Sequence, residues 1–322
     1  MFVNYHYFIV MAEENSISDA AKRLYVTPQA LCRYLSNLET ELNVTLFDRK
    51  PVLCLTDAGK MVLETLKDAD NLEQNLRNKL SDYNNNVVGA IKLGTTEGRF
   101  RILLPDIIEE YKKGYPLVSF YTHSAKSTGL RKMLAAGELD VIILNYTPGL
   151  EKQFDIETIL EENLYLVISD SMMKTYFGDK AEEYKELFKN GADLRLMADI
   201  PFAMNLPTFN SSIMIYDLLH RLGISLNFVH VSSHPDLHHM LSSRNLAASL
   251  CLTMYLPSVF RLNREAQEHL NIFPILGLDI TNRVVMGYAK NRIFSHYGRA
   301  LLEIIRSRSR NFKKYEASIT KN

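Results

Sequence analysis

The chain has 322 residues, 47% of them hydrophobic and 23% charged, which is too long for one typical domain and is typical of a globular protein with buried cores. Residues 1–60 carry six basic groups against seven acidic ones, so they lack the basic surplus usual in nucleic-acid-binding domains. No apolar run reaches the length of a membrane span, and Glu13 and Glu14 directly follow the apolar start, which excludes a signal peptide; we expect a cytoplasmic protein with no membrane partner.

Three short helices are predicted near the N-terminus. Residues 2–14 have apolar side chains at helical spacing, which should face the two helices that follow. Ser18 is expected to cap the second helix, and Thr27 with Pro28 to begin the third. Apolar residues recur along one face of the third helix, which is therefore core: Leu31, Leu35, Leu38 and Leu42. The sequence predicts a helix-turn-helix.

The opposite face of the third helix is polar and carries Gln29, Arg33 and Ser36. A helical hairpin with such a face is often ordinary architecture, so geometry alone leaves both packing and DNA binding open. Val44 to Arg49 and Pro51 to Leu55 predict two short strands, as in a wing. With so little net charge, DNA binding would depend on where the cations lie and on two or more modules in each complex.

A long helix is expected next, capped by Thr56 and Asp57 and running to about Tyr83. Its apolar residues recur in alternating steps of four and three: Val62, Leu66, Ala69, Leu76, Leu80 and Tyr83. This heptad pattern favours pairing with a second copy, although a helix hidden under a domain would show the same pattern. Residues 84–86 are three asparagines, and Gly89 follows them, so a domain boundary is predicted there.

Strands and helices alternate from Ala90 onward, which predicts a mostly parallel α/β arrangement in two lobes joined by crossing strands, with a cleft between them. The expected strands are Ile91 to Gly94, Leu117 to Thr122, Asp140 to Leu144, Leu164 to Ser169, Phe202 to Met204, Leu226 to Val231, Ala248 to Leu252, Ile272 to Leu276 and Val284 to Ala289. The expected helices are Ile102 to Lys113, opening at Pro105, then Ser127 to Ala136, Ser212 to Leu222, Pro235 to Ser243, one near Leu256, and Phe294 to Arg306. The basic end beyond Arg306 is expected to be solvated, with contact to phosphate as the alternative.

Two sets of residues carry a resemblance to a known family. The run AAKRL-V-PQAL-R-L--LE-EL-V-LFDR, followed by LTDAG at Leu55 to Gly59, resembles the N-terminal module of LysR-type transcriptional regulators. The segments LLPDIIEEYKKGYP, LAAGELDVIIL and DIPFAM resemble the effector domain of the same regulators, a relative of periplasmic solute-binding proteins. The resemblance covers nearly the whole chain. It implies an α/β protein overall: a mainly α-helical winged helix-turn-helix over residues 1–60, a linker helix over 57–86, a two-lobed effector-binding domain over 88–310 and a polar tail over 311–322.

The resemblance implies a double-stranded DNA operator as partner. Gln29 and Arg33 are then expected to read base edges in the major groove, with Ala30 on the same surface. The expected phosphate contacts are Thr27, Ser36, Arg49 and Lys50. Two departures from the family stand out. Thr27-Pro28-Gln29 replaces the common Ser-Gln-Pro order, and Leu53-Cys54-Leu55 stands where an arginine commonly sits.

A small-molecule effector is expected between the lobes, because ligands of α/β lobes lie at strand carboxyl ends and helix N-termini. Three loops qualify, and the resemblance points to the same loops. They contribute Thr95, Thr96, Glu97, Ser124, Ser127, Thr128, Met204, Asn205, Leu206 and Thr208. Their hydroxyl and N–H groups suit a small anionic or polar ligand, or merely cap helices. Arg99 and Arg101 either offset Glu97 or lie on the surface.

Other clusters predict less. His230, His234, His238 and His239 are close in sequence, but Pro235 disturbs their helical spacing, so a partly exposed polar helix is expected and no metal site. The three cysteines fit no disulfide framework. No G-x-S-x-G, Walker, H-E-x-x-H or glycine-rich dinucleotide motif is present in the sequence, so we expect neither a catalytic residue nor a cofactor.

The favoured interpretation is a DNA-binding transcription regulator that responds to an effector and forms a homodimer or homotetramer through the long helix. The alternative is a small-molecule binding protein or enzyme whose N-terminal helices only dimerise. A third interpretation keeps DNA binding but fills the cleft with side chains.

Overall fold

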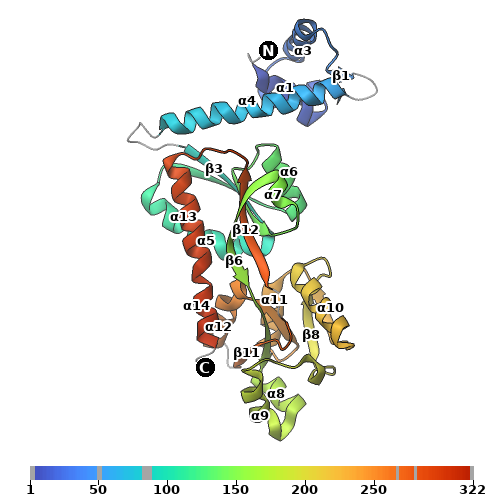
Figure 1. Ribbon diagram of the computed structural model, residues 1–322, viewed down its shortest axis with the longest axis vertical. Helices are drawn as coiled ribbons and strands as arrows, with labels where there is room; N and C mark the ends of the chain where they lie inside the picture. The colour runs from blue at the N-terminus through green and yellow to red at the C-terminus, as the bar shows by residue number, and fades with distance from the viewer. Residues whose placement is uncertain (1–3, 49–52, 82–88, 266–267, 279–280, 320–322) are drawn as a thin grey trace. The chain divides into compact units, whose positions relative to one another are not determined.

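A computed structural model describes residues 4–48, 53–81, 89–265, 268–278 and 281–319 (Figure 1). The chain divides into two compact units. One comprises residues 1–85 with 292–295, and the other comprises residues 86–291 with 296–322. We describe each unit by itself.

The N-terminal unit is a helix-turn-helix with a short two-stranded wing, as predicted. Its elements are α1 Tyr5–Glu14, α2 Ile17–Leu24, α3 Pro28–Leu42, β1 Phe47–Asp48, β2 Cys54–Leu55 and α4 Asp57–Ser81. The two strands pair antiparallel. The expected face of α3 is buried, because Leu31, Leu35 and Leu38 pack with Phe8 and Met11 of α1 in one apolar core.

The caps of α2 and α3 show why these helices begin where they do. Thr27 caps α3 as predicted, since its Oγ1 accepts a hydrogen bond from the Ala30 backbone at 3.2 Å and Pro28 occupies the first helical position. The prediction of Ser18 as the cap of α2 is wrong. Ser16 takes that role, because its Oγ accepts from the Asp19 N–H at 3.3 Å, the amide three residues further on.

The linker helix α4 starts at a tight contact with the wing. Thr56 caps it by accepting from the Gly59 N–H at 3.0 Å. A Cβ atom at Gly59 would lie 2.0 Å from the Leu46 carbonyl oxygen, so only glycine allows this close approach.

Some apolar residues of α4 are buried in the N-terminal unit, and others are exposed to solvent. Val62 and Leu66 pack against the helix-turn-helix core, so this part of the pattern belongs to the unit's own interior. Leu72 and Leu76 are 70% and 56% exposed, and Met61 is 71% exposed. At 3.6 residues per turn, these three side chains lie within about 60° of one another around the helix axis. They form one exposed apolar stripe. The side chain of Leu80 and the predicted end at Tyr83 lie outside the described residues.

The C-terminal unit contains two five-stranded mixed sheets (Figure 1). Lobe I has the strand order β4-β3-β5-β12-β6, and lobe II has the order β11-β7-β10-β8-β9. The bounds in lobe I are β3 Gly89–Thr95, β4 Val118–Ser124, β5 Val141–Asn145, β6 Phe154–Glu162 and β12 Asn282–Ala289. Those in lobe II are β7 Leu164–Ser169, β8 Pro201–Asn205, β9 Asn227–Ser232, β10 Ala248–Leu252 and β11 Leu270–Pro274.

Each sheet has two parallel and two antiparallel pairs, so the prediction of a mostly parallel arrangement is wrong. In lobe I, β3 pairs parallel with β4 and β5, and β12 pairs antiparallel with β5 and β6. In lobe II, β8 pairs parallel with β9 and β10, and β7 pairs antiparallel with β10 and β11. The chain enters lobe II with only Asn163 between β6 and β7, and β12 brings it back. The predicted crossing strands are therefore present.

Helices cover both sheets. Lobe I has α5 Glu97–Gly114, α6 Ser127–Ala135, α7 Leu150–Gln153 and α13 His296–Asn311. Lobe II has α8 Asp170–Phe177, α9 Ala181–Phe188, α10 Asn210–Leu222, α11 Pro235–Ser242 and α12 Leu256–Glu265. The segment expected to be solvated continues α13 to Asn311 and then forms α14, Lys313–Ile319, whose Glu316 accepts hydrogen bonds from Asn163 and Thr253.

The predicted start of α5 at Ile102 is wrong, and so is its opening at Pro105. The helix begins at Glu97, and Pro105 lies inside it. Thr96 has an extended backbone, so the helical turn starts directly after β3. A proline there removes one backbone hydrogen bond without ending the helix, because neighbouring packing holds Leu103, Leu104 and Ile107 in the core.

Candidate functional site

The outer face of α3 is open to solvent. Thr27, Gln29, Ala30, Arg33 and Ser36 are all exposed. In the described part of the chain, the side chains of Gln29 and Arg33 have no hydrogen-bond or ion-pair partner. The two predicted wing contacts, Arg49 and Lys50, lie outside the described residues.

Arg33 differs from the other cations of this unit. The described residues from 4 to 60 contain four Lys and Arg side chains. Lys22 pairs with Asp19 at 2.9 Å, and Lys60 pairs with Asp57 at 2.7 Å. Arg23 pairs with Glu13 at 2.7 Å and with Glu14 at 2.9 Å. Only Arg33 among these four lacks a carboxylate partner, so its charge is available to a ligand.

Sequence reasoning missed one exposed aromatic residue beside α3. Tyr25 lies in the turn after α2 with a left-handed backbone (φ 55°), and its side chain is 97% exposed. A left-handed tyrosine is unusual, since a Cβ atom disfavours this conformation. Here the left-handed residue ends α2, with its N–H donating to the Lys22 carbonyl, and turns the chain toward α3.

In the first of the predicted effector loops, residues 95–97, some side chains are buried and hydrogen-bonded within lobe I and others are exposed. Thr95 is fully buried, and its hydroxyl donates to the Ile143 carbonyl at 3.0 Å, so it joins two strands of lobe I. Thr96 is half-buried and accepts from Arg99 Nη1 at 3.2 Å. Glu97 is exposed at the first position of α5, and its carboxylate lies 3.9 Å from His234 Nδ1 in lobe II. Arg101 is exposed and lies 3.4 Å from the same imidazole nitrogen.

The other two loops also combine buried and exposed residues. At the end of β4, Ser124 is exposed, and at the start of α6, Ser127 is half-buried and Thr128 is exposed. In lobe II, Met204 and Asn205 are buried, whereas Leu206 and Thr208 are exposed. Across the described residues, no hydrogen bond joins the loop after β4 to the loop after β8. The lobes meet instead through the N-terminal ends of α5 and α11, where Arg101 also lies 4.0 Å from Asp236.

A buried polar network joins the lobes behind these loops. Arg99 Nη2 lies 2.8 Å from Glu162 Oε2, and the two side chains are 7% and 0% exposed. The same guanidinium donates to Asn145 Oδ1 at 2.5 Å. Asn282 Nδ2 donates to Glu162 at 2.7 Å, and the Met254 N–H donates to the other carboxylate oxygen at 3.2 Å.

This network was not predicted. Its members come from α5, β5, the crossing strands β6 and β12, and the lobe II turn Thr253–Tyr255. Tyr255 of lobe II packs against the start of α5, because its hydroxyl oxygen would lie 1.9 Å from a Cβ atom added at Gly98. Burial raises the pKa of the Tyr255 phenol above its usual value, so the phenol stays neutral.

The histidine group is also more buried than expected. His238 and His239 are 1% and 0% exposed, so the prediction of a partly exposed polar helix is wrong for both. His238 Nε2 is hydrogen-bonded to Ser232 Oγ at 2.9 Å, and His239 Nδ1 to Ser249 Oγ at 3.1 Å. Burial lowers the pKa of His238 to about 4 and that of His239 to about 3. Both are neutral core residues at neutral pH.

Among the described residues, no group of three or more His, Cys, Asp or Glu side chains is arranged to hold a metal ion. No helix in the same residues has the length and apolarity needed to cross a membrane.

Comparisons with known proteins agree with this architecture. Residues 2–60 match the family model for the bacterial regulatory helix-turn-helix protein of the lysR family, and residues 84–310 match that for the LysR substrate binding domain. YcgK of Bacillus subtilis, an uncharacterized HTH-type transcriptional regulator, is 22% identical over 93% of this chain and 92% of its own length. The HTH-type transcriptional regulator CysB of Haemophilus influenzae is 29% identical over 45% of this chain, a match that spans only 46% of CysB.

A solved structure shows the same fold over almost the whole chain. Full-length OxyR from Pseudomonas aeruginosa, a variant with one substitution, superposes with a TM-score of 0.67 at 19% identity, covering 96% of this chain and 94% of that one. The chain therefore belongs to the LysR family of transcriptional regulators, with a helix-turn-helix DNA-binding domain followed by a substrate-binding domain.

Proposed function

We propose that this regulator acts in the cytoplasm and recognises a double-stranded operator by laying α3 in the major groove. Gln29 and Arg33 contact base edges, with Ala30 beside them. The phosphate contacts are Thr27, Ser36, Arg49 and Lys50, to which we add the exposed Tyr25. The observation that carries this proposal is the exposure of Arg33 on α3 without a carboxylate partner.

Replacing Arg33 with Ala is expected to weaken operator binding by roughly 5- to 150-fold, because one bidentate contact between arginine and guanine contributes about 1–3 kcal/mol. Fluorescence anisotropy with duplexes that the wild-type protein selects from a random library measures this change. Lys22→Ala is the matched control, since Lys22 is exposed but already paired with Asp19. Equal affinity of Arg33→Ala and wild type would contradict the proposed base contact.

We also propose that two copies of the chain pair through the apolar stripe of α4, defined by Met61, Leu72 and Leu76. An amphipathic helix with an exposed apolar stripe is stabilised when a second helix covers that stripe. A two-fold dimer would present two α3 helices to successive half-sites of the operator, and pairs of dimers would give the tetramers common in the family.

The double variant Leu72→Lys with Leu76→Lys is expected to raise the dimer dissociation constant by roughly 100-fold or more, because each buried leucine contributes about 1.5–3 kcal/mol. Sedimentation velocity over a concentration series measures the change. Leu187→Lys is the control, since Leu187 is a leucine of α9 with 55% exposure. Unchanged assembly of the double variant would show that α4 does not mediate pairing.

For the effector we propose a small polar molecule bound where the N-terminal ends of α5 and α11 face each other. Glu97 and Arg101 of lobe I and His234 of lobe II support this position, together with the exposed hydroxyls of Ser124, Thr128 and Thr208. Helix N-termini bind anionic groups favourably, and the carboxylate of Glu97 favours an amine or a hydroxyl. A ligand that carries an anionic group together with an amine or hydroxyl therefore suits this position. Ligand-induced thermal stabilisation of the full-length protein, abolished by Arg101→Ala, is the expected result.

A further inference from the structure

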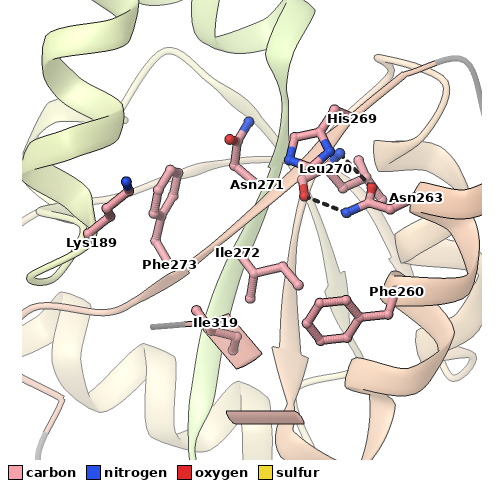
Figure 2. A pocket seen from close by; sticks show the side chains of 9 residues that line it. All are labelled: Lys189, Phe260, Asn263, His269, Leu270, Asn271, Ile272, Phe273 and Ile319. Carbon is pink, nitrogen blue, oxygen red and sulfur yellow. Dashed lines mark hydrogen bonds between the residues drawn. The ribbon is translucent and has the colours of Figure 1, made fainter. Parts of the chain in front are cut away.

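Lobe II has a small hollow at the outer edge of its sheet (Figure 2). Its volume is about 80 Å³, and we call it the β11 hollow because it opens over the edge strand β11. Residues from β11, α12 and α14 line it, together with Lys189 directly after α9 and His269 directly before β11. Among the other lining residues are Phe260, Asn271, Ile272 and Ile319. Neither α10 nor α11 contributes a residue to the lining of the hollow among the described residues.

An edge strand normally exposes a row of unpaired backbone groups, yet most of this row is covered. Leu270 donates its N–H to Asn263 Oδ1 at 2.7 Å, and its carbonyl accepts from Asn263 Nδ2 at 2.9 Å. Figure 2 shows this pair of bonds as dashed lines. At the other end of the strand, the Pro274 carbonyl accepts from the Ala192 N–H at 2.7 Å, and proline has no N–H to satisfy.

Ile272 lies between these two covered positions. Backbone groups along an antiparallel strand point alternately toward and away from the partner strand. The backbone N–H and C=O of Leu270 and the C=O of Pro274 point away from β7. Ile272 is two residues from each of them, so its N–H and C=O also point away from β7. No residue in the described part of the chain bonds to them on that side. The edge is therefore open at one position, and Figure 2 shows Ile272 beside Phe260 and Ile319 there.

We propose that the β11 hollow binds a small molecule with a primary carboxamide or lactam group attached to an apolar body. The chain itself shows the recognition geometry, since one carboxamide, that of Asn263, satisfies both backbone groups of Leu270. A ligand carboxamide would make the same two bonds with Ile272, about 7 Å further along the strand. Phe260 and Ile319 would then cover the apolar body, as apolar walls do in most ligand sites.

Titration of benzamide into the full-length protein, followed by saturation-transfer difference NMR, tests this site. Ile272→Pro removes the outward N–H and leaves the bonds to β7 in place, because proline is tolerated on an edge strand where its nitrogen faces outward, as Pro274 already does. We expect this variant to bind benzamide roughly tenfold more weakly than wild type, consistent with the loss of one buried hydrogen bond. The matched variant Ile272→Val retains the N–H and should bind as wild type does.

A comparison of two amides that bind to the wild-type protein provides an independent test. N,N-dimethylbenzamide keeps the ring and the carbonyl but has no N–H to donate to the Ile272 carbonyl, so it should bind more weakly to wild type. Equal thermal midpoints of the Pro and Val variants establish that both are folded. The proposal is overturned by equal binding of benzamide to wild type and Ile272→Pro, by equal binding of the two amides, or by no binding of benzamide up to its solubility limit.

Discussion

Replacing Glu162 with Gln is expected to destabilise the C-terminal unit by about 3–5 kcal/mol, the usual cost of removing one partner from a buried ion pair. The substitution leaves the Arg99 guanidinium buried beside neutral groups, while the shape of the side chain and its contact with Asn282 are kept. Urea unfolding of the full-length protein, followed by far-ultraviolet circular dichroism, measures the loss.

The double variant Arg99→Met with Glu162→Met is the informative control. It removes both charges together, so no uncompensated charge remains, and we expect it to lose less stability than either single substitution. A Glu162→Gln variant that unfolds within 1 kcal/mol of wild type would show that the pair is hydrated, contrary to its burial.

Acidification is expected to destabilise the same unit through His238 and His239. Both pKa values are lowered by burial, to about 4 and about 3, whereas an unfolded histidine titrates near 6.5. Above about pH 7.5 both residues are almost fully neutral in the folded and the unfolded state, so they contribute almost no pH dependence there. Below it the unfolded state binds protons that the folded state cannot, so each histidine lowers the free energy of unfolding by about 2 kcal/mol between about pH 7.5 and about pH 5.

The pH dependence of unfolding in urea, compared between wild type and His239→Leu, measures this contribution. The variant should lose about half of the histidine-dependent decrease, because leucine does not titrate and His238 remains. A decrease as steep in His239→Leu as in wild type would mean that His239 is protonated in the folded state.

The helix-turn-helix was predictable because its signals are local. Thr27 and Pro28 mark the start of α3, and the leucine spacing determines which face is buried, so the exposure of Gln29 and Arg33 follows from sequence alone. The cap of α2 was misplaced by two residues because Ser16 and Ser18 both fit a capping pattern. Only the register of the backbone amides distinguishes them.

The C-terminal unit was less predictable where polar residues lie inside strands. The strand β6 has the sequence FDIETILEE, whose acidic residues conceal its β character. Two of these are satisfied by distant partners: Glu157 by Arg306, at 2.7 Å, and Glu162 by Arg99. A search for local alternation detects neither pair, because the partners lie far apart in the sequence and meet only when lobe I has folded. For the same reason the inter-lobe network was missed.

The apolar pattern on α4 shows a different limit of prediction from sequence. Apolar residues at heptad spacing predict a helix that is covered on one side, but they do not identify the part of the structure that covers it. Val62 and Leu66 are covered within their own unit, and the stripe that remains exposed is rotated toward Met61 and Leu72.

The position of β12 has a consequence for how the protein is made on the ribosome. Translation of lobe I begins before that of lobe II. However, β12, the strand that lies between β5 and β6 in the sheet of lobe I, comprises residues 282–289 and is translated late. Every strand of lobe II, residues 164–274, is made before it. A nascent chain must therefore carry β5 and β6 with open edges until lobe II has emerged, and open strand edges are where chains associate wrongly. We infer that the sheet of lobe II is completed first, and that the sheet of lobe I is completed only after β12 has been translated.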